Sequence, residues 1–100
     1  MADAMENLRQ SLKSAPVIWK GDYPYFIHPI TDGVPRMHPE VLESITELVV
    51  QRIDWSEVDL LLGIEAMGLP LSAPVSISTG LPLVVARKRA YGLEGEVKID

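Results

Sequence analysis

The sequence predicts an α/β domain organised around one βαβ unit. Two short apolar runs, residues 60–64 (LLLGI) and 83–86 (LVVA), have the continuous hydrophobic pattern of parallel strands covered on both faces. Residues 69–79 between them can form a helix, with Pro70 in the tolerant first turn and Gly80 at the place of a left-handed C-cap. Parallel strands joined by a helix cross over right-handed, so the segments that follow the two strands share one carboxyl edge. Ligands of open α/β sheets bind at that edge.

Length and composition restrict the class of protein. One hundred residues make one domain at most, and 47% hydrophobic with 23% charged residues is ordinary for a globular chain. The net charge of -5 argues against a general nucleic-acid surface, and the absence of cysteine excludes disulfides, thiolate metal sites and a cysteine nucleophile. No apolar run reaches the ~18 residues of a membrane span, and the acidic N-terminus lacks the order of a secretory signal. We expect a soluble, cytoplasmic protein with no membrane or nucleic-acid partner.

An amphipathic helix is expected at the N-terminus, from Asp3 to about Ser14. Asp3 can act as its N-cap, and apolar residues recur behind it at spacings of three and four. Pro16 ends this helix because it pushes the preceding residue out of the α region.

Residues 16–38 are interpreted as a flap beside the core. Residues 23–27 form an aromatic stretch that Pro24 confines to an edge or an irregular strand. Residues 31–35 have turn chemistry, with Gly33 free to take a positive φ. For the aromatic side chains of this flap a hydrophobic cluster is favoured over a stacking platform for a flat base.

A second helix is expected over residues 39–53. Pro39 suits its first position, and the helix should pack on the sheet. Its predicted apolar face comprises Val41, Leu42, Ile45, Leu48 and Val49.

Two features of the C-terminal half depart from an ideal pattern. Pro74 removes a backbone donor inside the central helix, so we expect that helix to begin nearer Leu71. The alternation of Val97 and Ile99 predicts a third strand that begins as the chain stops.

The residues that follow the two strands could carry chemistry. Residues 65–68 (EAMG) form a strand-to-helix turn, where backbone N–H groups converge at a helix N-terminus and can bind a phosphate-type anion. The single glycine is weak support, and a plain turn explains it as well. Three consecutive cations, residues 87–89, follow the next strand and could clamp a polyphosphate beside that turn. On the residues alone, an anion site and a solvated basic surface remain open. The isolated His28 and His38 indicate packing or surface roles, so we expect no metal ligands among the side chains.

Three stretches together resemble a known enzyme family. They are residues 25–35 (YFIHPITDGVP), 63–68 (GIEAMG) and 85–97 (VARKRAYGLEGEV). They resemble the archaeal hypoxanthine/guanine phosphoribosyltransferases, which are similar to adenine phosphoribosyltransferase. The likeness covers nearly the whole chain in order, and its most specific part is the run RKRAYGLEGE.

The resemblance implies a fold and a reaction. The fold is α/β and type I phosphoribosyltransferase-like: a partial parallel sheet flanked by helices with an N-terminal hood. Residues 1–100 would be a single, incomplete domain, with the hood or flap at 16–38 and the central βαβ unit and basic loop at 58–94. The reaction is purine salvage: phosphoribose passes from phosphoribosyl pyrophosphate, with Mg²⁺, to hypoxanthine or guanine (or adenine). The products are the nucleotide and pyrophosphate, and the enzyme is expected to be a homodimer.

The resemblance also assigns roles to residues. Residues 65–68 would be the pyrophosphate loop, Arg87 and Lys88 would hold the donor's pyrophosphate across a dimer interface, and residues 91–96 would belong to a mobile catalytic loop. Residues 23–35 would form part of the hood over the purine. We also expect a strained or cis peptide between Ala66 and Met67. The substrate-binding residues implied are Glu65, Ala66, Met67, Gly68, Arg87, Lys88, Arg89 and Tyr91, and the catalytic residue implied is Glu94, which would assist proton transfer at the base.

Two departures from the family pattern limit what can be carried over. Adenine enzymes commonly have a basic residue where Met67 stands. The signature that binds the ribose 5-phosphate is absent, so the chain resembles the front half of such an enzyme, and activity of the 100 residues alone is not expected. The alternatives are a ligand-sensing regulator with a phosphoribosyltransferase-like domain, and an inactive truncated scaffold. The choice of purine is not determined by the sequence.

Overall fold

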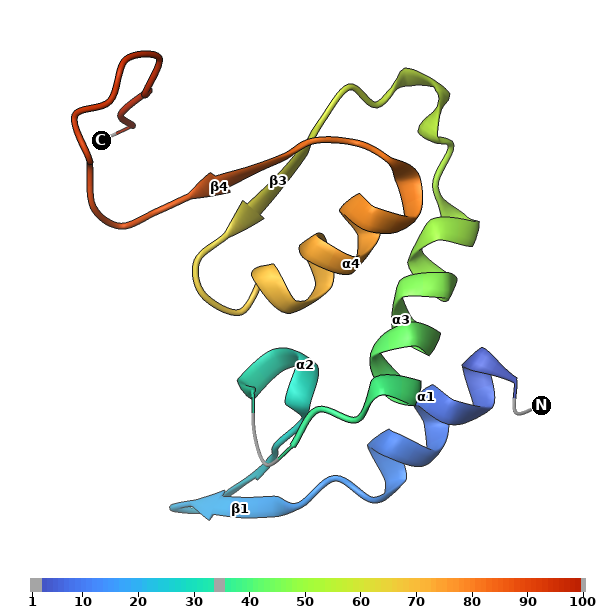
Figure 1. Ribbon diagram of the computed structural model, residues 1–100. Helices are drawn as coiled ribbons and strands as arrows, with labels where there is room; N and C mark the ends of the chain where they lie inside the picture. Colours follow the sequence, from blue (N-terminus) through green and yellow to red (C-terminus); the bar gives the residue numbers. More distant parts are fainter. Residues whose placement is uncertain (1–2, 34–35, 100) are drawn as a thin grey trace.

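The computed structural model describes residues 3–33 and 36–99, and it has an α/β architecture (Figure 1). Two separate two-stranded sheets are present in the described residues, one antiparallel and one parallel. The elements in chain order are α1 (Ala4–Lys13), β1 (Val17–Lys20), β2 (Tyr23–Phe26), α2 (Pro29–Asp32), α3 (Pro39–Arg52), the 3₁₀ turn η1 (Trp55–Glu57), β3 (Leu61–Ile64), α4 (Leu69–Thr79) and β4 (Leu83–Ala86).

The predicted βαβ unit is confirmed. Strands β3 and β4 pair in parallel, and α4 connects them. Gly80 ends α4 with φ of 75°, the left-handed conformation expected of a C-cap glycine. The expected start nearer Leu71 was wrong, because α4 begins at Leu69 with Pro74 inside it. Pro70 lies in the first turn, where the backbone amides have no intrahelical partner, whereas Pro74 lies inside the helix and removes one backbone donor.

Helix α4 packs closely on one face of the parallel sheet. A Cβ on the buried Gly63 would overlap Ser72 Oγ and would lie 3.1 Å from Leu69 Cδ2. The opposite face is uncovered, since Leu62 and Ile64 are each 62% exposed. The sheet is therefore covered on one side only within the described part of the chain.

Helix α3 begins at Pro39 as predicted, but the expectation that it packs on the sheet was wrong. Its contacts are with α1 and α4 (Figure 1). Its buried residues are Ser44, Ile45 and Thr46, and the side-chain amide of Asn7 on α1 donates to Ser44 Oγ at 2.9 Å. The physical reason is that α3 buries its inner face against α1 and α4, so it extends the helical layer that α4 forms on one face of the sheet.

The flap consists of a β-hairpin and one short helix. Strands β1 and β2 pair antiparallel, and Pro24 lies opposite Trp19 in a two-stranded ribbon, as its missing donor requires. Gly33 takes the predicted positive φ of 74°. Helix α2 was not anticipated, and the part of the predicted 31–35 turn at residues 34–35 lies outside the described residues.

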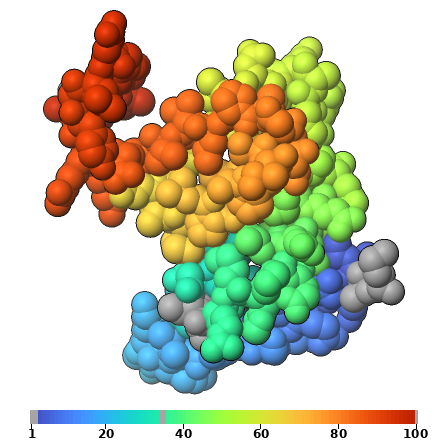
Figure 2. Space-filling model, viewed as in Figure 1, coloured from blue at the N-terminus to red at the C-terminus, as the bar shows by residue number. Residues whose placement is uncertain are grey.

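The predicted third strand is not formed over residues 96–99. This segment runs away from the body of the molecule, and no strand lies beside it to supply a hydrogen-bonding partner (Figures 1 and 2). Val97 is 83% exposed and Ile99 is 90% exposed. The accessible surface of 7778 Å² exceeds the roughly 5,700 Å² expected of a compact chain of this mass. Much apolar surface is therefore left open.

No helix in the described residues is both long enough and apolar enough to cross a membrane.

Candidate anion-binding site at the carboxyl edge of the sheet

In the turn between β3 and α4, the backbone amides of Ala66 and Met67 have no backbone acceptor within the described residues. The amides on either side of them are bonded: the N–H of Glu65 donates to the carbonyl of Ala86 at 3.0 Å, and that of Gly68 donates to the carbonyl of Ile64 at 3.0 Å. The amides of Ala66 and Met67 lie one turn before the body of α4, at its partially positive N-terminus. This arrangement suits a phosphate-type anion.

The backbone of this turn has two particular features. A cis peptide joins Glu65 to Ala66, so the predicted position between Ala66 and Met67 was wrong by one residue. Gly68 approaches the preceding strand so closely that a Cβ on it would lie 2.7 Å from the carbonyl oxygen of Ile64. Only glycine fits this position without a shift of the backbone.

The basic residues begin directly after β4, beside this turn. Glu65 links the two segments: its Oε1 accepts from the Lys88 amide at 2.8 Å, and its Oε2 lies 3.7 Å from Arg87 Nη2. The Arg87 guanidinium also lies over the Tyr91 ring, 5.0 Å from the ring centre. Four of the predicted site residues are thus brought together.

The loop that follows borders an open hollow of about 610 Å³. The predicted site residues on its lining are Arg87, Lys88, Arg89, Tyr91 and Glu94. Glu94 lies in an exposed turn with Gly95. Residues 65–68 do not line this hollow. The site is therefore an open edge with a loop beside it.

Glu96 is a residue of this loop that the sequence reasoning did not single out. Its carboxylate accepts from the Tyr91 amide at 3.0 Å and from the Leu93 amide at 3.4 Å. The Tyr91 bond, joined by those of Leu93 and Gly92, lowers the pKa of Glu96 below its ordinary value of 4.5. Two glycines with positive φ, at 92 and 95, let the chain fold back in this way, and their spacing was the available signal.

Met67 does not point to the basic loop. A Cβ built on Gly33 would lie 3.3 Å from Met67 Cε, so this side chain reaches the flap. The carboxyl edge of the sheet and the flap therefore meet at Met67.

The flap is joined to α1 through the fully buried His28. Its Nδ1 accepts from the Ile30 amide at 3.2 Å, which places the ring proton on Nε2, 2.9 Å from Ser11 Oγ on α1. Asp32 closes the same turn: it accepts from the His28 amide at 3.0 Å, and this bond lowers the pKa of its carboxyl group. The packing role predicted for His28 is confirmed.

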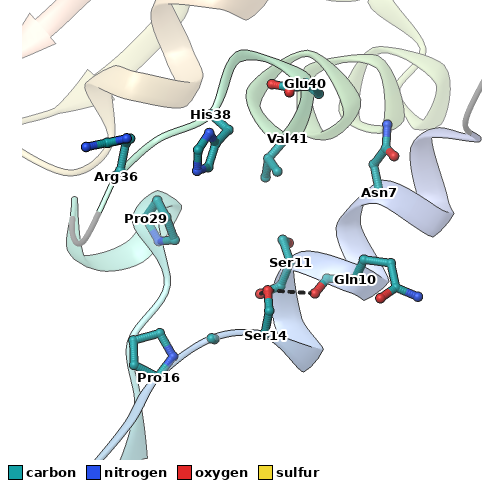
Figure 3. A pocket seen from close by; sticks show the side chains of 11 residues that line it. Asn7, Gln10, Ser11, Ser14, Pro16, Pro29, Arg36, His38, Glu40 and Val41 are labelled. Atoms are coloured by element: carbon teal, nitrogen blue, oxygen red, sulfur yellow. Dashed lines mark hydrogen bonds between the residues drawn. The ribbon is translucent and has the colours of Figure 1, made fainter.

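A second pocket, of about 510 Å³, lies between α1 and residues 36–41 (Figure 3). Pro29 and His38 lie across it from the side chains of α1, and Arg36 is also part of its lining. None of the predicted site residues lines it. We place the site at the sheet edge, because charged side chains and free amides converge there.

Amides at a helix N-terminus with cations beside them are an arrangement that proteins use to bind phosphate-type anions. No protein-family model matches the chain. It is 54% identical over 95 residues to the hypoxanthine/guanine phosphoribosyltransferase of Methanobrevibacter ruminantium, covering 95% of this chain and 50% of that protein. It is 50% identical over 96 residues to the enzyme of the same name from Methanohalophilus mahii, covering 96% and 50%. It is also 50% identical over 96 residues to HGPRTase-like protein 1 of Haloquadratum walsbyi, covering 96% and 51%.

The chain is therefore a relative of the archaeal hypoxanthine/guanine phosphoribosyltransferases, and it spans about half the length of the curated relatives it matches.

Proposed function

We propose that this chain supplies the pyrophosphate-binding part of a purine phosphoribosyltransferase of the type I fold. The substrates would be phosphoribosyl pyrophosphate and hypoxanthine or guanine, as the names of the relatives suggest. The observation that carries the proposal is the pairing of two segments at one sheet edge. The amides of Ala66 and Met67 lie at a helix N-terminus, and Glu65 joins that turn to Arg87 and Lys88.

The reaction fits this edge chemically. The bond from the ribose C1 to the pyrophosphate oxygen breaks, a bond from C1 to a purine ring nitrogen forms, and that nitrogen loses its proton. Negative charge grows on the leaving pyrophosphate, so fixed cations and backbone donors around it lower the barrier. Arg87, Lys88 and the two free amides would supply these donors. Glu94 would accept the purine proton when the loop closes.

Mg²⁺ would enter with the donor substrate. No group of three or more metal-ligating side chains is present in residues 3–33 and 36–99. Magnesium retains several waters and commonly binds through substrate phosphates with one or two carboxylates, so the donor's own oxygens would provide most of its ligands.

The hood and the partner subunit complete the proposal. The flap, which reaches the sheet edge through Met67 and Gly33, would cover the purine. The proposed enzyme would be a homodimer, with the sheet edge that carries Arg87 and Lys88 near the subunit interface. The apolar surface left open by the described residues, including Leu62 and Ile64, supports burial against further protein.

The names of the relatives favour an enzyme over a ligand-sensing regulator.

The direct test is a chimera. The chain is joined to the part of the Methanobrevibacter ruminantium relative that it does not match, and nucleotide formation from hypoxanthine, guanine and adenine is measured with phosphoribosyl pyrophosphate and Mg²⁺. We expect turnover with hypoxanthine or guanine. A folded chimera that forms no nucleotide with any purine would contradict the proposal.

A further inference from the structure

We propose that Glu65 is a positioning residue, whose carboxylate holds the segment of Arg87 and Lys88 at the carboxyl edge of the sheet. The inference rests on the proposed function only in naming pyrophosphate as the anion that the edge receives. It assigns Glu65 a role other than contact with the substrate.

Glu65 contacts β4 and the segment after it through both its backbone and its side chain. Its backbone N–H donates to the carbonyl of Ala86 at 3.0 Å, which extends the parallel ladder by one bond. Its side chain then reaches two residues further and accepts from the Lys88 amide at 2.8 Å. The chain is therefore held for two residues beyond the end of β4, where the hydrogen bonds between the two strands no longer hold it.

The two carboxylate contacts differ in strength. The 2.8 Å contact with the Lys88 amide is a short, charge-assisted hydrogen bond, whereas the 3.7 Å approach to Arg87 Nη2 is a loose ion pair between partly exposed groups. The stronger bond of Glu65 is therefore with the backbone, and the Arg87 guanidinium remains available to bind an anion. The Tyr91 ring supports that guanidinium, with its centre 5.0 Å away.

The charge of Glu65 makes direct contact with a pyrophosphate unfavourable. A carboxylate repels a bound polyphosphate, and it would lower the affinity of the edge unless a cation stood between them. Three consecutive cations repel one another as well, and Glu65 is the anion that the structure places against the first of them. Its net effect before an anion binds is to hold the basic segment in place.

Two substitutions separate the role of the hydrogen bond from that of the charge. Glu65→Gln keeps an oxygen that can accept from the Lys88 amide but removes the negative charge. Glu65→Ala removes both. Glu57→Ala, on the exposed 3₁₀ turn, changes the net charge equally and serves as the control.

The measurements use the 100-residue chain with Mg²⁺ and inorganic pyrophosphate as the probe. Amide hydrogen exchange of Lys88 is followed by NMR, and pyrophosphate binding is followed by chemical-shift titration of the same amides. In Glu65→Ala we expect Lys88 to exchange about tenfold faster or more, and pyrophosphate to bind about tenfold more weakly. In Glu65→Gln we expect exchange close to that of the parent and affinity equal or up to a few-fold higher.

Different outcomes overturn different statements. If the Lys88 amide exchanges equally fast in the parent and in Glu65→Ala, the positioning role is wrong. If Glu65→Gln loses as much affinity as Glu65→Ala while keeping Lys88 protected, Glu65 is a ligand of the substrate or its metal, and the inference also fails. If the parent shows no pyrophosphate binding, the proposed function loses its support, and the exchange of Lys88 alone decides the inference.

Discussion

The end of the Met67 side chain lies against Gly33, where a Cβ would stand 3.3 Å from Met67 Cε and 3.4 Å from its sulfur. These residues belong to the turn after β3 and to the flap. The flap is joined to α1 through the bond between His28 and Ser11. Met67 is therefore a side chain through which the flap meets the turn after β3.

We expect Met67→Ala to loosen the flap. The residue is half-buried, so the substitution should destabilise the chain by about 1–2 kcal/mol, below the range for a fully buried methionine. The amides of Asp32 and Gly33 should exchange faster in NMR, while those of β4 should not. Met67→Leu, which conserves volume, is the control. Unchanged exchange at Gly33 in Met67→Ala would show that the contact does not hold the flap.

Gly68→Ala should damage the strand-to-helix turn. The new Cβ would lie 2.7 Å from the carbonyl oxygen of Ile64 and 2.9 Å from its nitrogen, and backbone atoms cannot move away as a side chain can. We expect a loss of about 1–3 kcal/mol in urea unfolding, as for other overpacked sites. Ala73→Gly, at an exposed position of the same helix, gives the comparison and should cost roughly 0.5–1 kcal/mol. A smaller loss for Gly68→Ala than for Ala73→Gly would contradict the steric account.

Asp32 should make the flap sensitive to acid. The His28 amide, followed by the Thr31 hydroxyl, lowers the pKa of Asp32 below 3.8, its ordinary value. A carboxyl group with a lowered folded pKa adds stability that is complete above the unfolded pKa and is lost as the pH falls through the folded pKa. The parent should therefore be more stable than Asp32→Asn at pH 7, and the difference should vanish as the pH falls below 3.8.

Urea unfolding of both proteins at several pH values measures this difference. Asp22→Asn, on the hairpin turn, controls for the change of one charge. A stability difference that stays constant down to pH 2 would remove Asp32 as its cause.

The two glutamates of the C-terminal loop should have separate effects. Glu94 is the predicted proton acceptor, whereas the carboxylate of Glu96 accepts from the Tyr91 and Leu93 amides. In the active chimera, Glu94→Gln should lower kcat by about 10²–10⁴-fold, the usual contribution of a positioned acid or base. Glu96→Gln should raise the exchange rate of the Tyr91 amide and reduce kcat less. The reverse order of effects on kcat would move the catalytic assignment from Glu94 to Glu96.

The βαβ unit could be predicted because its signals are local. The apolar runs at 60–64 and 83–86 and the C-cap at Gly80 each depend on a few neighbouring residues. The packing of α3 could not be predicted in the same way. An apolar helix face indicates burial but does not say against which element, and in the structure α3 packs against α1 and α4.

The candidate site could likewise be predicted from the sequence only in part. The sequence places residues 65–68 and the basic residues at one sheet edge, because parallel strands end together. It does not show that Glu65 bonds the Lys88 amide 23 residues away, or that Met67 turns to the flap. The strand expected at Val97 and Ile99 failed because alternation marks a capacity to pair, and pairing needs a neighbouring strand.

Arg87→Ala in the active chimera should weaken use of the phosphoribosyl donor. Arg87 directly follows β4, and its guanidinium is held between Glu65 and Tyr91, so its position is set before substrate arrives. Removing a charge-assisted contact of this kind costs roughly 1.5–3 kcal/mol. This corresponds to about a ten- to hundredfold loss in kcat/KM for the donor. The KM for the purine should change little, because the flap would carry that contact.

Steady-state kinetics with each substrate varied in turn distinguish these effects. Arg9→Ala, which removes the same charge from the exposed face of α1, should leave both substrates unaffected. A twofold or smaller change in donor kcat/KM for Arg87→Ala would place the guanidinium outside the site. An equal loss for donor and purine would indicate instead that Arg87 supports the loop as a whole, since its stacking on Tyr91 would then be its main role.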